Sequence, residues 1–130
     1  MRDEFVGPGG ASLAEALAFL DAHPEVQGID LALIDCHGIA RGKTIRRHEL
    51  EGLYTSGRGI PGSIFAQDVC GDDVEETGLV WEVGDADLQC RPVPGSLSRA
   101  PWLARPTGQV LGTMHELDGT PARADPRHVL

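Results

Sequence analysis

The chain has 130 residues and a formal net charge of −9 at pH 7, from 20 acidic and 11 basic residues. This length suits one domain with its own core and is short for two. The negative charge argues against nucleic acid or an anionic membrane surface as a partner, because both repel acidic proteins.

The numbers of glycine, proline and cysteine residues further limit the classes of protein that fit the sequence. Seventeen glycines and nine prolines predict a loop-rich structure with more strand than helix. The three cysteines, Cys36, Cys70 and Cys90, are odd in number and contain no C-x-x-C pair, which favours free thiols over disulfides or a zinc site. Without a signal peptide or a membrane-spanning apolar run, the sequence indicates a cytoplasmic protein.

The first predicted element is a helix. Residues 1–11 are expected to be a flexible lead-in, and Ser12 with Glu15 then form a capping box. Apolar residues follow at helical spacing, and Pro24 ends the helix. These apolar residues are Leu13, Ala16, Leu17 and Leu20.

Residues 29–45 predict a β-hairpin. Residues 31–34 are apolar on both faces, as in a buried strand, and Gly38 supplies the left-handed residue of a turn at 35–38. Alternation in the returning strand places Arg41 and Lys43 on one face between Ile39 and Ile45. The two cations are candidates for an interface or a local anion site, although most charged runs are solvated strand faces.

Two segments resemble nucleotide-binding motifs but do not meet all of their requirements. Residues 38–44 end in Gly-Lys-Thr, but three residues rather than four precede the Gly-Lys pair, and a strand stands where a P-loop begins its helix. Residues 57–62 match G-x-G-x-x-G, but a helix ending at Gly57 precedes them and a predicted strand at 63–66 follows. Pro61 also removes one N–H group. Neither pattern predicts a nucleotide site.

The second half predicts strands joined by acidic turns. Residues 68–76 form an exposed loop without the ligand spacing of a calcium site. Strands are predicted at 79–83, 88–93 and 109–117, with Asp118 and Gly119 in a hairpin turn. Trp102 is expected to pack rather than to hold a ligand.

The last residues predict the start of another helix. Asp125 is an N-cap and Pro126 occupies the first helical position. A single helical turn is not stable alone, so we expect residues 125–130 to lead into a further domain of a longer protein.

Several motifs in order resemble the N-terminal β-grasp domain of the glutamine synthetase family. They are Asp35-x-x-Gly38-x-x-Arg41-Gly42-Lys43, Gly84-Asp85-x-Asp87, residues 94–97 (Pro-Gly-Ser-Leu), Pro101-Trp102, Asp118-Gly119-x-Pro121 and Asp125-Pro126-Arg127. The pattern is most similar to the γ-glutamylputrescine and γ-glutamylpolyamine synthetases. The resemblance implies an α+β fold of the β-grasp type (a ubiquitin-like roll) over residues 12–124, with a mixed sheet of four to six strands and one or two helices.

The resemblance also implies an activity. Members of this family are ATP-dependent ligases that activate glutamate as γ-glutamyl phosphate, which an amine or ammonia then attacks. ATP and Mg²⁺ or Mn²⁺ are expected in the catalytic domain, and none is expected on this segment. The small domain is expected to pack against the catalytic domain of its own or a neighbouring subunit in a homo-oligomer and to be inactive alone.

One departure from the family bears on the substrate. Ammonia-using members carry an Asp-Gly-Ser-Ser-Ile loop at the active-site rim, and aligning Ser63-Ile64 with it puts Ile60 in place of the Asp. The resemblance makes Ile60, Pro61, Gly62, Ser63 and Ile64 the rim loop, with an apolar wall that suits an alkyl amine. The alternatives are a glutamine synthetase proper that uses ammonia and a stand-alone β-grasp interaction module. No catalytic residue or metal ligand is assigned.

Overall fold

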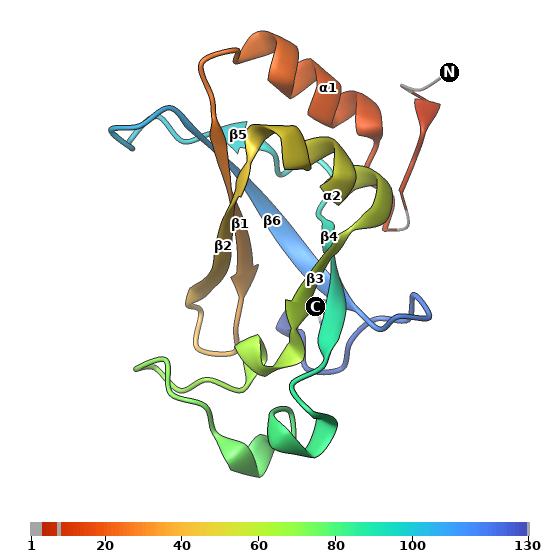
Figure 1. Cartoon of the computed structure of the whole chain (residues 1–130), viewed down its shortest axis with the longest axis vertical. Coiled ribbons are helices and arrows are strands. Elements are labelled where there is room, and N and C mark those ends of the chain that lie inside the picture. The colour runs from red at the N-terminus through yellow and green to blue at the C-terminus, as the bar shows by residue number, and fades with distance from the viewer. Residues whose placement is uncertain (1–3, 8, 130) are drawn as a thin grey trace.

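The computed structural model describes residues 4–7 and 9–129 (Figure 1). Among the described residues, two strands separate the first α-helix from the second, and four strands follow the second α-helix. Short 3₁₀ helices lie between and after these elements. In chain order they are α1 Leu13–Ala22, β1 Gly28–Ile34, β2 Ala40–Arg46, η2 Arg47–Glu49, α2 Leu50–Ser56, β3 Arg58–Pro61, η3 Gly62–Phe65, η4 Glu75–Thr77, η5 Trp81–Val83, β4 Asp87–Pro92, β5 Ser98–Arg99, β6 Thr107–His115 and η6 Pro126–Val129.

The strands form one mixed sheet in the order β2-β1-β6-β4-β3, and the short β5 pairs with β6. β1 is antiparallel to β2 and parallel to β6, whereas the β6–β4 and β4–β3 pairs are antiparallel. In Figure 1, β6 runs diagonally between the β1–β2 pair and the β3–β4 pair, and both α-helices lie at one end of the sheet. The predicted α+β fold of the β-grasp type is confirmed.

The core lies between the two α-helices and one face of the sheet. The helices contribute Leu13, Phe19, Leu50 and Tyr54, and the strands contribute Ile29, Leu31, Leu33, Ile45, Val110 and Met114. All of these are buried, among them Leu13 of the predicted first helix and Leu31 and Leu33 of the predicted buried strand.

The predicted helix and hairpin are confirmed, with one difference at the first cap. Ser12 Oγ accepts a hydrogen bond from the Ala14 amide at 3.2 Å. The Glu15 carboxylate accepts instead from the Tyr54 hydroxyl at 3.1 Å and from the amides of Gly95 and Leu97. Glu15 therefore joins the two helices to the 95–97 turn rather than closing the predicted capping box.

Two predicted strands are wrong. Residues 63–66 lie in η3 and its end, and the strand is instead the preceding segment, Arg58–Pro61, because it pairs with β4. Residues 79–83 end in η5, with Trp81 74 % exposed. β4 pairs with β3 on one side and with β6 on the other. Residues 79–83 therefore cannot pair with β4 as a further strand.

In three other segments the structure differs from the sequence-based expectations or adds a contact to them. Trp102 is 70 % exposed, so the prediction that it packs in the interior was wrong. Ala11 is buried, and the Phe5 carbonyl accepts from the Leu13 amide at 2.9 Å, so the described part of the lead-in packs on α1.

Asp125 caps η6 through the Arg127 amide, and its second oxygen accepts from the Met114 amide at 2.7 Å. No helix among the described residues is long and apolar enough to cross a membrane.

Candidate functional site

The candidate site is a cavity of about 500 Å³ between the two edges of the sheet. One wall is the first part of β2, and the other is the end of β3 with η3. Its lining residues are Ala40, Arg41, Gly42, Lys43, Ile60, Pro61, Ser63, Ile64 and Gln67. β2 and β3 are the outermost strands of the sheet order, so a cavity that contacts both shows that the sheet curls strongly.

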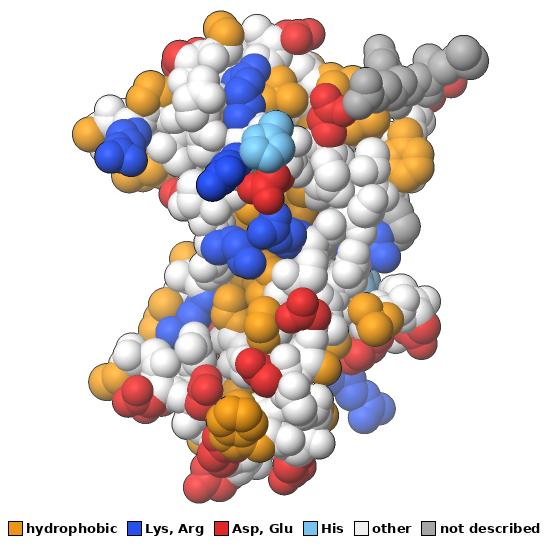
Figure 2. Space-filling model, viewed as in Figure 1, with side chains coloured by type: hydrophobic (Ala, Val, Ile, Leu, Met, Phe, Trp, Pro, Cys, Tyr) orange, Lys and Arg blue, Asp and Glu red, His pale blue; other side chains and the backbone are white. Residues whose placement is uncertain are grey.

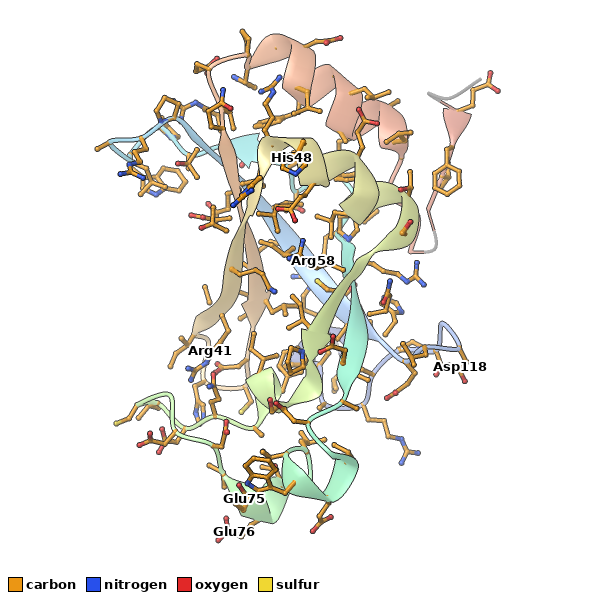
Figure 3. All side chains as sticks on the ribbon, viewed as in Figure 1. Arg41, His48, Arg58, Glu75, Glu76 and Asp118 are labelled. Atoms are coloured by element: carbon orange, nitrogen blue, oxygen red, sulfur yellow. The ribbon has the colours of Figure 1, made fainter. Side chains whose placement is uncertain are left out.

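The register of the hairpin directs both β2 cations towards this cavity. Leu31 lies opposite Lys43 and Leu33 lies opposite Arg41, and directly opposed residues of antiparallel strands point to the same face. That face is the one that carries the core residues Leu31 and Leu33. Figure 3 shows Arg41 at the end of β2 away from the α-helices, where the helices do not cover the sheet.

Arg41 is already occupied by contacts within the chain. Its Nε donates to Asp35 Oδ2 at 2.8 Å, and its Nη2 donates to the Asp68 carbonyl at 2.6 Å. Asp35 is only 3 % exposed, and its Oδ1 accepts from the amides of His37 and Ile39. Arg41 thus joins the hairpin turn to the loop after η3, which leaves its guanidinium little capacity for an external anion.

The environment of Asp35 explains its ionisation. Burial alone would raise the pKa of this carboxyl, but the Arg41 hydrogen bond and the two amide hydrogen bonds outweigh burial and lower the pKa below its usual value. Asp35 and Arg41 therefore form a charged pair at neutral pH.

The remaining lining residues combine one exposed cation with an apolar wall. Lys43 is exposed and makes no ion pair among the described residues. Ile60 is 2 % exposed and lines the cavity together with Pro61 and Ile64, which are half-buried. Gln67 Nε2 donates to the Gly71 carbonyl at 3.1 Å, so the carboxamide oxygen is the group of Gln67 that remains as an acceptor.

No Asp or Glu lines the cavity, in contrast to the chain as a whole. Eight of the 20 acidic residues lie in the segment 68–87, which has no Lys or Arg. Glu75 and Glu76 lie at the far tip of this segment, away from Arg41 (Figure 3). Figure 2 shows several acidic side chains at that end and most of the visible Lys and Arg side chains in the middle and at the opposite end, where other acidic side chains also lie.

The lining does not fit a metal ion. Mg²⁺ and Mn²⁺ prefer carboxylate oxygens, and the cavity offers none. Within residues 4–7 and 9–129, no group of three or more His, Cys, Asp or Glu side chains could hold a metal ion. Cys36 and Cys70 are exposed and Cys90 is buried, where burial and the nearby Asp125 charge raise its pKa to about 12.

The structure brings together two sets of residues that the sequence predicted separately. Arg41 and Lys43 face Ile60, Pro61, Ser63 and Ile64 across one cavity. Gly62 is buried under Leu88 and is not part of the lining, and residues 58–65 form a short strand followed by a 3₁₀ turn rather than an open loop. Gln67 and Ala40 were not predicted from the sequence, because no local pattern indicates that the sheet edges approach each other.

Comparison with known proteins gives a consistent assignment. No protein-family model matches the chain. It is 42 % identical over 124 residues, 94 % of its length, to the γ-glutamylputrescine synthetase PuuA of Escherichia coli K12. A solved glutamine synthase homologue matches 81 % of the chain with a TM-score of 0.69 and 27 % identity. A GmaS/ADP complex matches 80 % with a TM-score of 0.57, and its 21 % identity supports the fold alone.

Fold and sequence together define the class of protein to which the chain is similar, the glutamine synthetase homologues. Over 94 % of its length the chain is homologous to part of γ-glutamylputrescine synthetase. It spans about a quarter of the length of these relatives, 26 % of PuuA and 25 % and 21 % of the two solved chains.

Proposed function

We propose that this chain is the N-terminal domain of an ATP-dependent ligase that joins the γ-carboxyl group of glutamate to an amine. The observation that carries the proposal is the 42 % identity to γ-glutamylputrescine synthetase over 94 % of the chain. The domain itself is not catalytic in this proposal. ATP and Mg²⁺ or Mn²⁺ bind in a catalytic domain outside these 130 residues, which agrees with a cavity that lacks carboxylates.

In the assembled protein, residues 60–64 form part of the rim of an active site in a neighbouring subunit. Support comes from their position beside an open cavity at the end of the sheet that the α-helices leave uncovered. Lys43, on the opposite wall, is available for contact with a partner or a substrate, whereas Arg41 is held by Asp35 and Asp68.

An organic amine suits this rim better than ammonia. Ile60 stands where ammonia-using members of the family carry an Asp, and it is buried at the base of an apolar wall. An apolar wall binds an alkyl chain through the hydrophobic effect but offers no charge to an ammonium ion.

The test is an assay of the whole protein that contains this chain, with ATP, Mg²⁺, glutamate and either ammonia or a panel of primary amines. The expected result is ATP-dependent formation of γ-glutamylamides, detected by mass spectrometry, with amines preferred over ammonia. If the protein forms no γ-glutamylamide with ammonia or with any of these amines, the proposal is overturned. Equal use of ammonia and amines would retain the ligase and overturn the amine preference.

The 130-residue chain alone tests the location of the cofactor sites. Calorimetric titration with ATP and Mg²⁺ is expected to give no binding signal. A saturable signal would place a nucleotide site on this domain and contradict the proposal.

A further inference from the structure

We propose that Asp125 and His128 are positioning residues: they fix the direction in which the polypeptide leaves this domain, and so hold residues 60–64 in place against the active site that these residues border. The proposal rests on the proposed function, which supplies the catalytic domain and the rim. The contacts that carry it lie within the described residues, at the end of β6.

β6 extends beyond the strand that covers one of its edges. β1 pairs with β6 only as far as Leu111, so the backbone of Met114 lies past the part of β6 that β1 covers. Met114 is fully buried, and a buried backbone N–H or C=O group is costly to leave without a partner. The chain after β6 has to supply the partners that β1 does not.

The turn before η6 and η6 itself supply these partners. The Met114 amide donates to Asp125 Oδ2 at 2.7 Å. The Met114 carbonyl accepts from the Ala122 amide at 3.0 Å and from His128 Nε2 at 2.7 Å. Asp125 is 1 % exposed, and its other oxygen accepts from the Arg127 amide at 3.0 Å. One residue of the sheet thus holds η6 at two points, and we call the bonds of Asp125 and His128 to Met114 the Met114 clamp.

The ring of His128 is held in place by its surroundings. Its edge packs against the His115 ring, with the ring centroids 5.0 Å apart. His115 contacts the Thr113 hydroxyl at 3.2 Å and the Gly119 carbonyl at 3.3 Å, so β6 and the turn after it fix the ring of His115. His128 Nε2 also lies 3.7 Å from Asp125 Oδ2. The two side chains of the clamp are therefore in contact with each other as well as with Met114.

η6 is too short to determine its own direction. It has four residues, Pro126–Val129, and an isolated helical turn of this length is not stable in water. The segment that follows η6 in the whole protein takes the direction that the clamp gives to η6. A change in this direction would shift residues 60–64 relative to the catalytic domain, and reaction rates depend steeply on such displacements.

Two substitutions of His128 separate positioning from general stability. A glutamine amide can donate to the Met114 carbonyl in place of His128 Nε2, whereas leucine has no donor. The Met114 carbonyl keeps its Ala122 hydrogen bond in both variants, so the sheet should remain folded. The matched control is His48→Leu, which changes an exposed histidine of η2.

Hydrogen exchange of the whole protein measures the position of the domain without an activity assay. His128→Leu is expected to raise the exchange rates of residues 122–129 and of residues 60–64 by about tenfold. His128→Gln and His48→Leu should leave both rates unchanged. Faster exchange at residues 122–129 alone would show that the clamp does not position the rim, and no change at 122–129 would show that His128 does not hold η6. Either result overturns the proposal.

The native proteins separate a failure of the clamp from a failure of the rim. Residues 60–64 are expected to exchange more slowly in the whole protein than in the 130-residue chain. Equal rates would overturn the rim role given under the proposed function, and the positioning role of the clamp with it.

The kinetic readout is amide formation by the whole protein. His128→Leu is expected to lower kcat/KM for the amine by about tenfold and to leave KM for ATP unchanged, because ATP binds outside this domain in the proposed function. His128→Gln should restore the native value. An equal loss in the two variants, or no loss in His128→Leu, overturns the proposal. A native protein that forms no amide fails the proposed function, and hydrogen exchange then decides the role of the clamp.

Discussion

Arg41 Nε and Asp35 Oδ2 lie 2.8 Å apart, with the Asp35 side chain 1 % and the Arg41 side chain 12 % exposed. The pair closes the β1–β2 turn, and the second contact of Arg41, to the Asp68 carbonyl, fixes the loop that begins beside Gln67. One guanidinium thus determines how two segments 27 positions apart meet at the cavity.

Removing this guanidinium should destabilise the fold. Arg41→Met leaves a buried carboxylate without its counter-ion, so we expect the free energy of unfolding to fall by about 3 kcal/mol. Urea denaturation measures the loss. Arg123→Met removes an exposed cation and should change stability by less than about 0.5 kcal/mol. Equal effects of the two substitutions would contradict the role assigned to the Asp35–Arg41 pair.

Acid should weaken the same contact. The pKa of Asp35 is lower in the folded chain than in the unfolded chain, where it is about 3.9. The folded state therefore binds fewer protons in this range, and the contribution is complete above about pH 4 and is lost as pH falls through the folded pKa. The Asp35 contribution to the urea midpoint, taken as the difference between the native chain and Asp35→Asn, is expected to be constant from pH 7 to about pH 5 and to fall below about pH 4. Asp35→Asn should be less stable at neutral pH and show a shallower acid decline; a decline as steep as in the native chain would contradict this.

The sequence predicted the hairpin but not the pair that closes it. Asp35 and Arg41 both appeared in the family motif, yet their contact depends on the register that places Leu33 opposite Arg41. The strand at 58–61 was missed for a related reason, because glycine and proline weaken local strand preference and pairing with β4 decides the structure. The sequence named the residues of the two cavity walls in separate groups, and their meeting depends on the curl of the sheet, which no local pattern records.

The single tyrosine provides a second test. Tyr54 is buried and donates to Glu15, and burial followed by the Glu15 charge raises its pKa. Because the chain has one tyrosine, phenolate absorbance reports this group alone. No phenolate signal is expected near pH 10, where an exposed tyrosine ionises, and the signal should appear together with alkaline unfolding.

Substitutions at the two partners separate their contributions. Tyr54→Phe should cost about 1 kcal/mol, the contribution of one hydrogen bond, and Glu15→Ala should cost more because the amides of Gly95 and Leu97 also lose an acceptor. Phenolate absorbance of the native chain that rises near pH 10 while circular dichroism remains unchanged would contradict the buried Tyr54–Glu15 contact.

Two glycines should respond in opposite directions to alanine. At Gly42, with φ of +147°, a Cβ would lie 1.8 Å from the Leu31 carbonyl oxygen, so Gly42→Ala should lower stability by more than about 2 kcal/mol. Gly52, within α2, has nothing within 4 Å of an added Cβ, and Gly52→Ala should raise stability by about 0.5–1 kcal/mol. Thermal unfolding of both variants checks the pair. Stabilisation by Gly42→Ala would show that β2 does not lie as close to β1 as described.

The position of β6 has a consequence for synthesis on the ribosome. β6 is the last strand in the chain, and it lies in the middle of the sheet, between β1 and β4. Until residues 107–115 emerge, the β1–β2 hairpin and the β3–β4 pair have no common neighbour, and the inner edges of β1 and β4 remain unpaired. Pairing β1 with β6 also closes a long loop, which slows folding. A nascent chain therefore completes this domain late, after its final strand has left the exit tunnel, and until then exposes two strand edges to other chains.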